Sequence, residues 1–212
     1  MTVNIIKLLI DAASNSVRSV NNKGHMPPHF LCDNKTLDES AAVEILKLLI
    51  EKHPESIQHA DNDGDLPIHL ACAWRSVEFC RVLIEAYPGS ERIANGHGGL
   101  PFHYACSNNY VATVECLYKL YSDAINHANT DGRYPIHYAI AGIHYAIAGM
   151  SHRNNPTAAV NIVKFLLDCD PNVKLQKYRG RLSLLDWACN FTQGSQSSRN
   201  FTIFTAAVGL FL

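Results

Sequence analysis

Two columns of reactive side chains run through this 212-residue sequence. Histidine recurs at one position of four similar segments: His29, His69, His103 and His137. Cysteine follows three of these histidines, at Cys32, Cys72 and Cys106, and recurs at Cys189 in a fifth similar segment. Imidazole and thiolate groups that converge on one point can bind zinc or form a nucleophile and its base. Whether they converge here depends on the elements that carry them.

Each histidine lies two residues after a proline and five after a glycine. The prolines are Pro27, Pro67, Pro101 and Pro135, and the glycines are Gly24, Gly64, Gly98 and Gly132. Proline favours the first position of a helix, and the residues before it are turn formers. Each histidine is therefore predicted in the first turn of a short helix. Pro67, Pro101 and Pro135 follow one another at intervals of 34 residues. Neighbouring histidines therefore lie one structural repeat apart, which is too far for them to share a metal ion.

A second, longer helix is predicted in each segment from its apolar periodicity. Apolar side chains recur at i, i+3, i+6 and i+7 from each of five valines: Val3, Val43, Val77, Val111 and Val160. Such a stripe is typical of an amphipathic helix with one buried face. Twenty-four residues after each valine stands the next proline, or Leu184 in the last copy. The chain therefore repeats a unit of turn, short helix, loop and longer helix.

The block Gly64-Asp-Leu-Pro-Ile-His-Leu-Ala-Cys72 resembles the T-P-L-H-x-A block of ankyrin repeats, whose period is about 33 residues. The resemblance covers about four to five repeats in residues 1–191. It implies an all-α ankyrin-repeat solenoid of stacked helix-turn-helix units with hairpin-like connecting loops. It also implies that the histidines are structural and hydrogen-bond across loops. The family's threonine is replaced by Met26, Leu66, Leu100 and Tyr134, and the loss of such a helix cap costs about 1 kcal/mol per helix.

The repeats divide the chain into units near 1–26, 27–66, 67–100, 101–134 and 135–183, with a partial last unit from 184. Residues 192–200 read as a polar linker, and residues 201–212 as an apolar tail or a degenerate final helix. Repeat arrays need polar terminal caps, and the sequence shows none at either end. We therefore expect a fragment of a longer protein or an imperfect gene model.

An identical heptad stands twice in a row in the fourth segment, as Ile136-His-Tyr-Ala-Ile-Ala-Gly142 and again over 143–149. Seven residues are nearly two helical turns, so the short helix can continue with the same face buried. The alternative is a duplication tolerated as a loop. Gly142 favours that broken version, because glycine within a helix costs about 1 kcal/mol.

Composition and charge limit the partners. Eighteen basic and nineteen acidic residues give a net charge of −1, which gives no reason to expect nucleic acid. No apolar stretch reaches the ~20 residues of a membrane span, so a membrane is not the expected partner either. Seven cysteines without C-x-x-C spacing predict a reducing, intracellular location, in the cytoplasm or alternatively the nucleus. We expect a monomer.

No catalytic, phosphate-binding or metal-binding motif occurs in the sequence, so we expect no enzyme, no cofactor and no metal. The expected function is protein binding through the concave face, which this architecture uses for partners. The predicted contacts are turn tips, which run from acidic to basic along the array, and residues after the short helices: Asn62, Asp63, Asp65, Trp74, His97, Asn108, Asp131, Arg133, Tyr178, Arg179 and Arg181. The alternatives are a regulatory fragment of a larger signalling protein or enzyme, and a membrane-associated adaptor held by the C-terminal tail.

Overall fold

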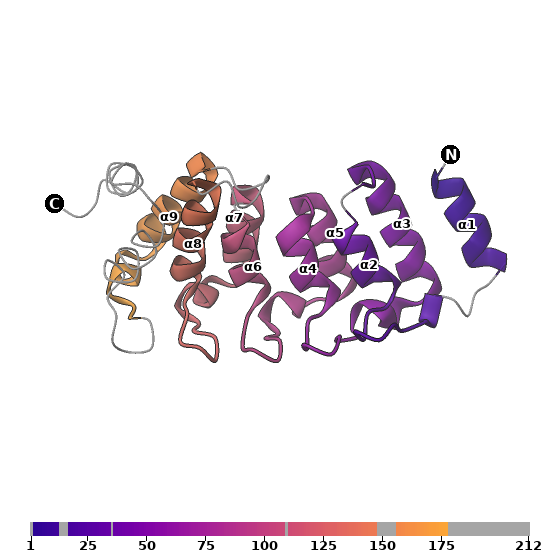
Figure 1. Cartoon of the computed structure of the whole chain (residues 1–212), viewed down its shortest axis with the longest axis horizontal. Coiled ribbons are helices and arrows are strands. Elements are labelled where there is room, and N and C mark those ends of the chain that lie inside the picture. The colour runs from indigo at the N-terminus through magenta and orange to yellow at the C-terminus, as the bar shows by residue number, and fades with distance from the viewer. Residues whose placement is uncertain (1, 13–16, 35, 109, 148–155, 178–212) are drawn as a thin grey trace. The chain divides into compact units, whose positions relative to one another are not determined.

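The computed structural model of the chain describes residues 2–12, 17–34, 36–108, 110–147 and 156–177. Within these ranges the secondary structure is helix and turn, without a strand. The expected all-α repeat architecture is thereby confirmed. The chain divides into two compact units, residues 1–101 and 102–212 (Figure 1).

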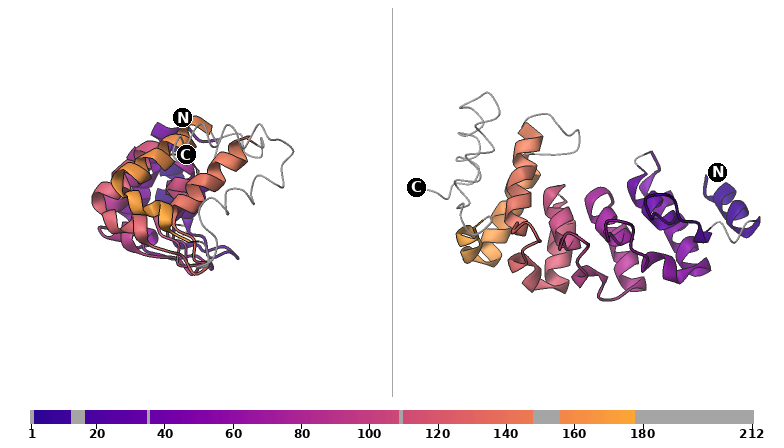
Figure 2. Two further views of the ribbon diagram at one scale, coloured as in Figure 1. Left: turned by 90° about the vertical axis from the view of Figure 1, so that its left-hand side faces the viewer. Right: turned by 60° about the horizontal axis from the view of Figure 1, so that its bottom comes forward.

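The first unit holds two rows of helices. The short helices α2 (Pro27–Asp33) and α4 (Pro67–Trp74) pack against each other and form one row. The longer helices α1 (Thr2–Ala12), α3 (Glu39–Lys52) and α5 (Val77–Ala86) form the other, where α3 contacts both neighbours. The 3-10 helices η2 (Pro54–Ile57) and η3 (Ser90–Arg92) lead out of α3 and α5. The turns between the pairs lie together at one edge of the unit (Figures 1 and 2).

The second unit continues the same alternation. Its short helices are α6 (Pro101–Ser107), which begins at the last residue of the first unit, and α8 (Pro135–Ile147). The longer helices are α7 (Val111–Leu120) and α9 (Pro156–Cys169), and α9 packs against both α7 and α8. The 3-10 helices η4 (Ser122–Asn126) and η5 (Pro171–Leu175) follow the longer helices.

The predicted starts of the short helices are confirmed, and so are the buried faces of α3, α5, α7 and α9, whereas α1 leaves Leu9 of its stripe 61% exposed. All four prolines stand at the first position of a short helix, where the N–H that proline lacks would have no helical partner. The apolar stripes of the longer helices form the cores. Stripe residues Leu46 and Leu83 in the first unit and Leu117 and Leu166 in the second are at most 2% exposed, and Phe79 and Ile162, which stand beside the stripes, are fully buried.

The repeated heptad extends α8, and the interpretation as a broken helix is wrong. α8 has 13 residues, against 8 in α4, and it runs on through Gly142, which is buried. Ile136 and Ile143, one heptad apart, are each 1% exposed. Burial of Ile143 contributes about 2–3 kcal/mol, which outweighs the glycine cost of about 1 kcal/mol.

The predicted partial unit from residue 184, the linker over 192–200 and the tail over 201–212 lie outside the described residues. These boundaries, like the unit boundaries at 26, 66, 100, 134 and 183, remain predictions. No helix in the described part of the chain combines the length and the apolar character that a membrane crossing needs.

Candidate functional site

The histidines close the first turns of the short helices. Nδ1 of His69 accepts the backbone N–H of Leu66 at 3.0 Å, and His29 and His137 do the same for Met26 and Tyr134 at 3.2 and 3.1 Å. The N–H that a threonine cap would bind donates instead to the carbonyl of the cap residue, three positions earlier, as from His69 to Leu66 O at 2.9 Å. Without a hydroxyl, a backbone carbonyl therefore accepts this N–H, and the imidazole accepts the N–H of the cap residue itself.

The other imidazole nitrogen reaches into the next loop. Nε2 of His29 lies 3.1 Å from Asp65 O, and Nε2 of His69 lies 3.1 Å from Ile93 O and 3.2 Å from Gly99 O. Because Nδ1 accepts, Nε2 carries the proton and donates, which defines a neutral imidazole. Burial lowers the pKa of His29 and of His69, and it lowers the pKa of His137 to about 4. The histidines are structural, as the resemblance implied.

The described members of the cysteine column lie in the core, and Cys189 lies outside the described residues. Cys32, Cys72 and Cys106 are fully buried, and burial raises the pKa of the Cys32 and Cys106 thiols. A thiol must ionise to act as a nucleophile or metal ligand, so these side chains serve packing. In the described part of the chain, no three His, Cys, Asp or Glu side chains form a group that could hold a metal ion.

The turns before the short helices share one hydrogen-bond pattern. In each, the first side chain accepts two backbone N–H groups, two and four residues ahead. Oδ1 of Asp61 accepts from Asp63 and Asp65, both at 2.9 Å, and Oδ1 of Asn95 from His97 and Gly99 at 3.0 and 2.8 Å. The same pattern begins at Asn21 and at Asn129. Asx turns of this kind form readily at Asn and Asp, so the sequence folds them locally.

In the first unit the turns are joined to each other. The backbone N–H of Asn62 donates to Lys23 O at 3.0 Å, and that of Gly96 donates to Asp63 O at 2.9 Å. The side chain of Asn95 donates to Asp65 Oδ1 at 2.8 Å. We call residues 21–25, 61–65 and 95–99 the turn ladder. Its backbone groups bond to one another, which leaves several side chains to face outward.

Substitution of Gly64 tests how closely the turn over 61–65 approaches the turn over 95–99. The φ of Gly64 is +80°, and a Cβ there would lie 2.5 Å from the backbone nitrogen of Gly96. Gly64→Ala is expected to lower the free energy of unfolding by about 2–3 kcal/mol, from the left-handed backbone and the clash together. Gly89 has a φ of +89° but no atom within 4 Å of such a Cβ, so Gly89→Ala is expected to cost about 1 kcal/mol. Urea denaturation measures both losses, and equal losses would contradict a tight contact between the turns.

The structure places the predicted contact residues of the first unit differently. Asn62, Asp63 and His97 are exposed on the turn ladder, and Trp74 is half-buried at the end of α4. Asp65 is only 8% exposed and holds Asn95, so it is not the exposed tip position that the sequence suggested. Its carboxylate connects two turns.

In the second unit, Asp131 is exposed and Arg133 half-buried on the turn over 129–133. Asn108 is half-buried at the end of α6, and its side chain donates to Tyr104 O at 3.2 Å. Tyr178, Arg179 and Arg181 lie outside the described residues. The role of all these residues in partner binding remains a prediction.

Arg75 is a structural residue that the sequence interpretation missed. It is 4% exposed, and its guanidinium donates to Leu31 O and Asn34 O at the C-terminal end of α2. It also pairs with Glu39 at 3.2 Å, and the other oxygen of Glu39 accepts the Ser76 N–H at 2.9 Å. Although burial opposes it, bonds from Ser76 and Arg75 hold the pKa of Glu39 below its usual range. The sign in the sequence was an arginine where the family has a helix-ending glycine.

Comparison with known proteins agrees with this geometry. Residues 2–92 match the family model of ankyrin repeats, in three copies. The fold is similar to the crystal structure of EF0377, an ankyrin repeat protein, with a TM-score of 0.67 and 17% sequence identity. That likeness covers 99% of this chain and 92% of the other chain, and at this identity it concerns the fold alone. No curated protein matches the sequence.

Proposed function

We propose that this chain, whose residues 2–92 match the family model of ankyrin repeats, is a non-catalytic module that binds a protein partner through its turn ladder and helix α4. Repeat arrays of this kind generally serve as protein-interaction surfaces. The partner meets the exposed side chains of Asn62, Asp63 and His97 on the turn ladder and reaches Trp74 at the far, C-terminal end of α4.

The observation that carries this proposal is the bonding within the turn ladder. Its backbone groups are bonded to Asx side chains and to neighbouring turns, for example Gly96 N–H to Asp63 O at 2.9 Å. The outward side chains are therefore held before a partner arrives, which reduces the entropy lost on binding. Asp63 projects a carboxylate from this rigid strip, and it favours a partner with a basic group at that point.

The described chemistry also supports a role without catalysis. The histidines of the short helices are buried, neutral and bonded within the fold. The described cysteines are all free thiols, which supports the further proposal of a reducing, intracellular location. The regulatory-fragment and tail-anchored alternatives depend on sequence outside the described residues.

A charge reversal tests the proposed surface. Affinity capture under reducing conditions is carried out with two baits, the unaltered full chain and the full chain carrying Asp63→Lys, and the proteins retained by each are compared. A bound partner is expected to lose at least tenfold in affinity, equal to about 1.4 kcal/mol. Trp74→Ala is expected to weaken the same partner, since tryptophan is enriched at binding hot spots.

Lys47→Glu is the matched control, because Lys47 is an exposed residue of α3, a longer helix away from the turns. It should leave capture unchanged. Partner retention by Asp63→Lys and loss by Lys47→Glu would place binding on the longer helices and refute the proposal.

A further inference from the structure

Two joints hold the turn ladder together, and they differ in their titratable groups. The first joint connects the first two turns of the ladder, and the second joint connects the last two. At the second joint the amide of Asn95 donates to Asp65 Oδ1 at 2.8 Å. At the first joint the equivalent bond runs from His25 Nε2 to Asp61 Oδ2, at 3.1 Å. An imidazole therefore pairs with a carboxylate where the second joint uses an uncharged amide.

Three imidazoles meet at the first joint. The rings of His25 and His29 are stacked with their centroids 5.3 Å apart, and the ring of His59 meets that of His29 edge-on at 6.1 Å. The carboxylate bonded to His25 belongs to Asp61, whose side chain is 4% exposed. The second joint has Ile93 at the position of His59, eight residues before a proline that opens a short helix. The cluster of imidazoles thus distinguishes the first joint from the second.

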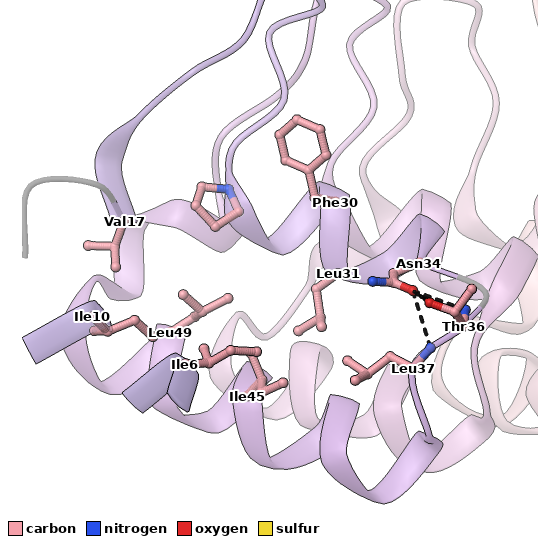
Figure 3. Close-up of a pocket in the computed structure, with 11 residues that line it drawn as sticks. Ile6, Ile10, Val17, Phe30, Leu31, Asn34, Thr36, Leu37, Ile45 and Leu49 are labelled. Atoms are coloured by element: carbon pink, nitrogen blue, oxygen red, sulfur yellow. Dashed lines mark hydrogen bonds between the residues drawn. The ribbon is translucent and has the colours of Figure 1, made fainter. Parts of the chain in front are cut away.

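Phe30 packs against this cluster from α2. Figure 3 shows Phe30 and Leu31 pointing to opposite sides of the helix, with Leu31 among apolar side chains such as Ile45. The ring of Phe30 meets that of His25 edge-on, with centroids 5.6 Å apart. Rings on two sides of His25 leave 18% of its side chain exposed.

Each imidazole bonds across the joint, but only one of them must stay neutral to keep its bonds. His59 donates from Nε2 to Gly24 O at 3.0 Å and His25 donates to a carboxylate, so both rings can keep these bonds as cations. Nδ1 of His29 accepts the Met26 N–H at 3.2 Å, which a protonated nitrogen cannot do. A proton on His29 therefore breaks the bond that closes the first turn of α2.

The groups that act on His29 come from both sides of the joint. Burial is the largest effect and lowers the pKa of this imidazole. The bond to Asp65 O and the charge of Asp61 oppose this effect, whereas His25 and His59 add to it. Because the folded joint holds His29 neutral, opening exposes a ring that binds a proton. Opening is therefore more favourable as the pH falls.

His69, the equivalent imidazole at the second joint, has a carboxylate for a neighbour. Burial lowers its pKa as well, but Asp65 Oδ1 lies 4.0 Å from Nδ1 and raises it. A proton at the second joint thus meets a negative charge, whereas protons at the first joint bring imidazolium cations together around one carboxylate. Acid acts on the two joints unequally.

We propose that acidification opens the turn ladder at its first joint before the second joint opens. The consequence for binding rests on the proposed function, because the first joint holds the contact residue Asn62. Its backbone N–H donates to Lys23 O and its side chain to Asn22 O, both at 3.0 Å. Opening releases Asn62 from this position, so the partner is bound more weakly in acid than at neutral pH.

Amide hydrogen exchange of the full chain, followed by NMR at pH 7 and pH 5, tests the opening. The backbone N–H groups of Met26 and Asn62 report on the first joint, and those of Leu66 and Gly96 are their counterparts at the second. Protection is the exchange rate of an unfolded chain divided by the measured rate at the same pH. Protection at Met26 and Asn62 is expected to fall about tenfold more than at Leu66 and Gly96.

The variant His25→Gln/His59→Gln keeps a donor at both positions but cannot take up a proton there. Its first joint should lose no more protection than its second joint. His97→Gln, at an exposed histidine of the second joint, should leave the difference between the joints unchanged. His59→Ile, which copies Ile93, replaces the double variant if that variant is already open at pH 7. Equal losses at both joints of the unaltered chain, or an undiminished difference in the glutamine variant, would overturn the proposal.

A partner captured at pH 7 separates this proposal from the proposed function. Its affinity for the unaltered chain is expected to fall about tenfold from pH 7 to pH 5, and less for the glutamine variant. A partner that depends on Asp63 yet binds equally at both pH values would refute the effect on binding and leave the proposed surface intact. If no partner depends on Asp63 at pH 7, the proposed function fails, and hydrogen exchange still decides whether the first joint opens.

Discussion

Replacement of Arg75 by alanine is expected to lower the free energy of unfolding by about 2–4 kcal/mol, because two backbone carbonyls lose their buried donor. Its ion-pair partner Glu39 has a side chain that is 40% exposed and can be rehydrated. The guanidinium is buried and makes bonds to Leu31 O, to Asn34 O and to Glu39. Its loss leaves carbonyls at the end of α2 without a donor, and each such unsatisfied group costs about 1–3 kcal/mol. The guanidinium also lies 5.5 Å from the centre of the Phe79 ring, where it adds a cation–π contact.

Urea denaturation of Arg75→Ala measures this loss directly. Arg75→Lys should recover only part of it, because an ammonium cannot bond to the two carbonyls and the carboxylate in the same fork geometry. Arg81→Ala is the control, since Arg81 is exposed on the adjoining helix α5. Equal and small losses for both alanine variants would show that the Arg75 contacts contribute little.

A fall in pH from 7 to 4.5 is expected to remove about 2–3 kcal/mol of stability through His137 alone. Burial lowers the pKa of this imidazole from 6.5 to about 4 in the folded protein. Between these values the unfolded chain binds more protons than the folded one, so the free energy of unfolding rises with pH. The contribution is complete above pH 6.5 and is lost as the pH falls toward 4. His29 and His69, whose pKa values are also lowered by burial, act in the same direction.

Unfolding curves in urea at pH 7, 6, 5 and 4.5 test this dependence. His137→Gln should flatten the curve of stability against pH, although it lowers stability at pH 7. His97→Gln, at an exposed histidine of the turn ladder, is the control for the substitution itself. Stability independent of pH over this range would mean that the buried imidazoles do not control it.

Most of the helical framework could be predicted from the sequence because its determinants are local. Proline at the first helical position, glycine with positive φ in the turns and the apolar stripes act within a few residues. They placed the starts of α2, α4, α6 and α8 correctly. The structural role of the histidines came from the resemblance, and their bonds to Asp65 O and Gly99 O are confirmed.

The features that the sequence did not reveal depend on contacts between repeats. Arg75 directly follows α4, yet it bonds to residues 36 to 44 positions earlier in the chain. Asp65 has the charged side chain that is typical of an exposed turn tip, but it is buried, and Asn95 of the next turn donates a hydrogen bond to it. Gly142 suggested a break, and the burial of Ile143 outweighed its local cost. Local propensity carries no information about such partners.

The turn ladder as the partner-binding surface is tested most directly by site-specific cross-linking. A photoactivatable amino acid is placed at position 63 in one bait and at position 47 of α3 in another, and both are illuminated with native lysate. We expect a covalent adduct with a discrete protein from position 63 and none from position 47. Adducts from position 47 alone would contradict the proposed surface.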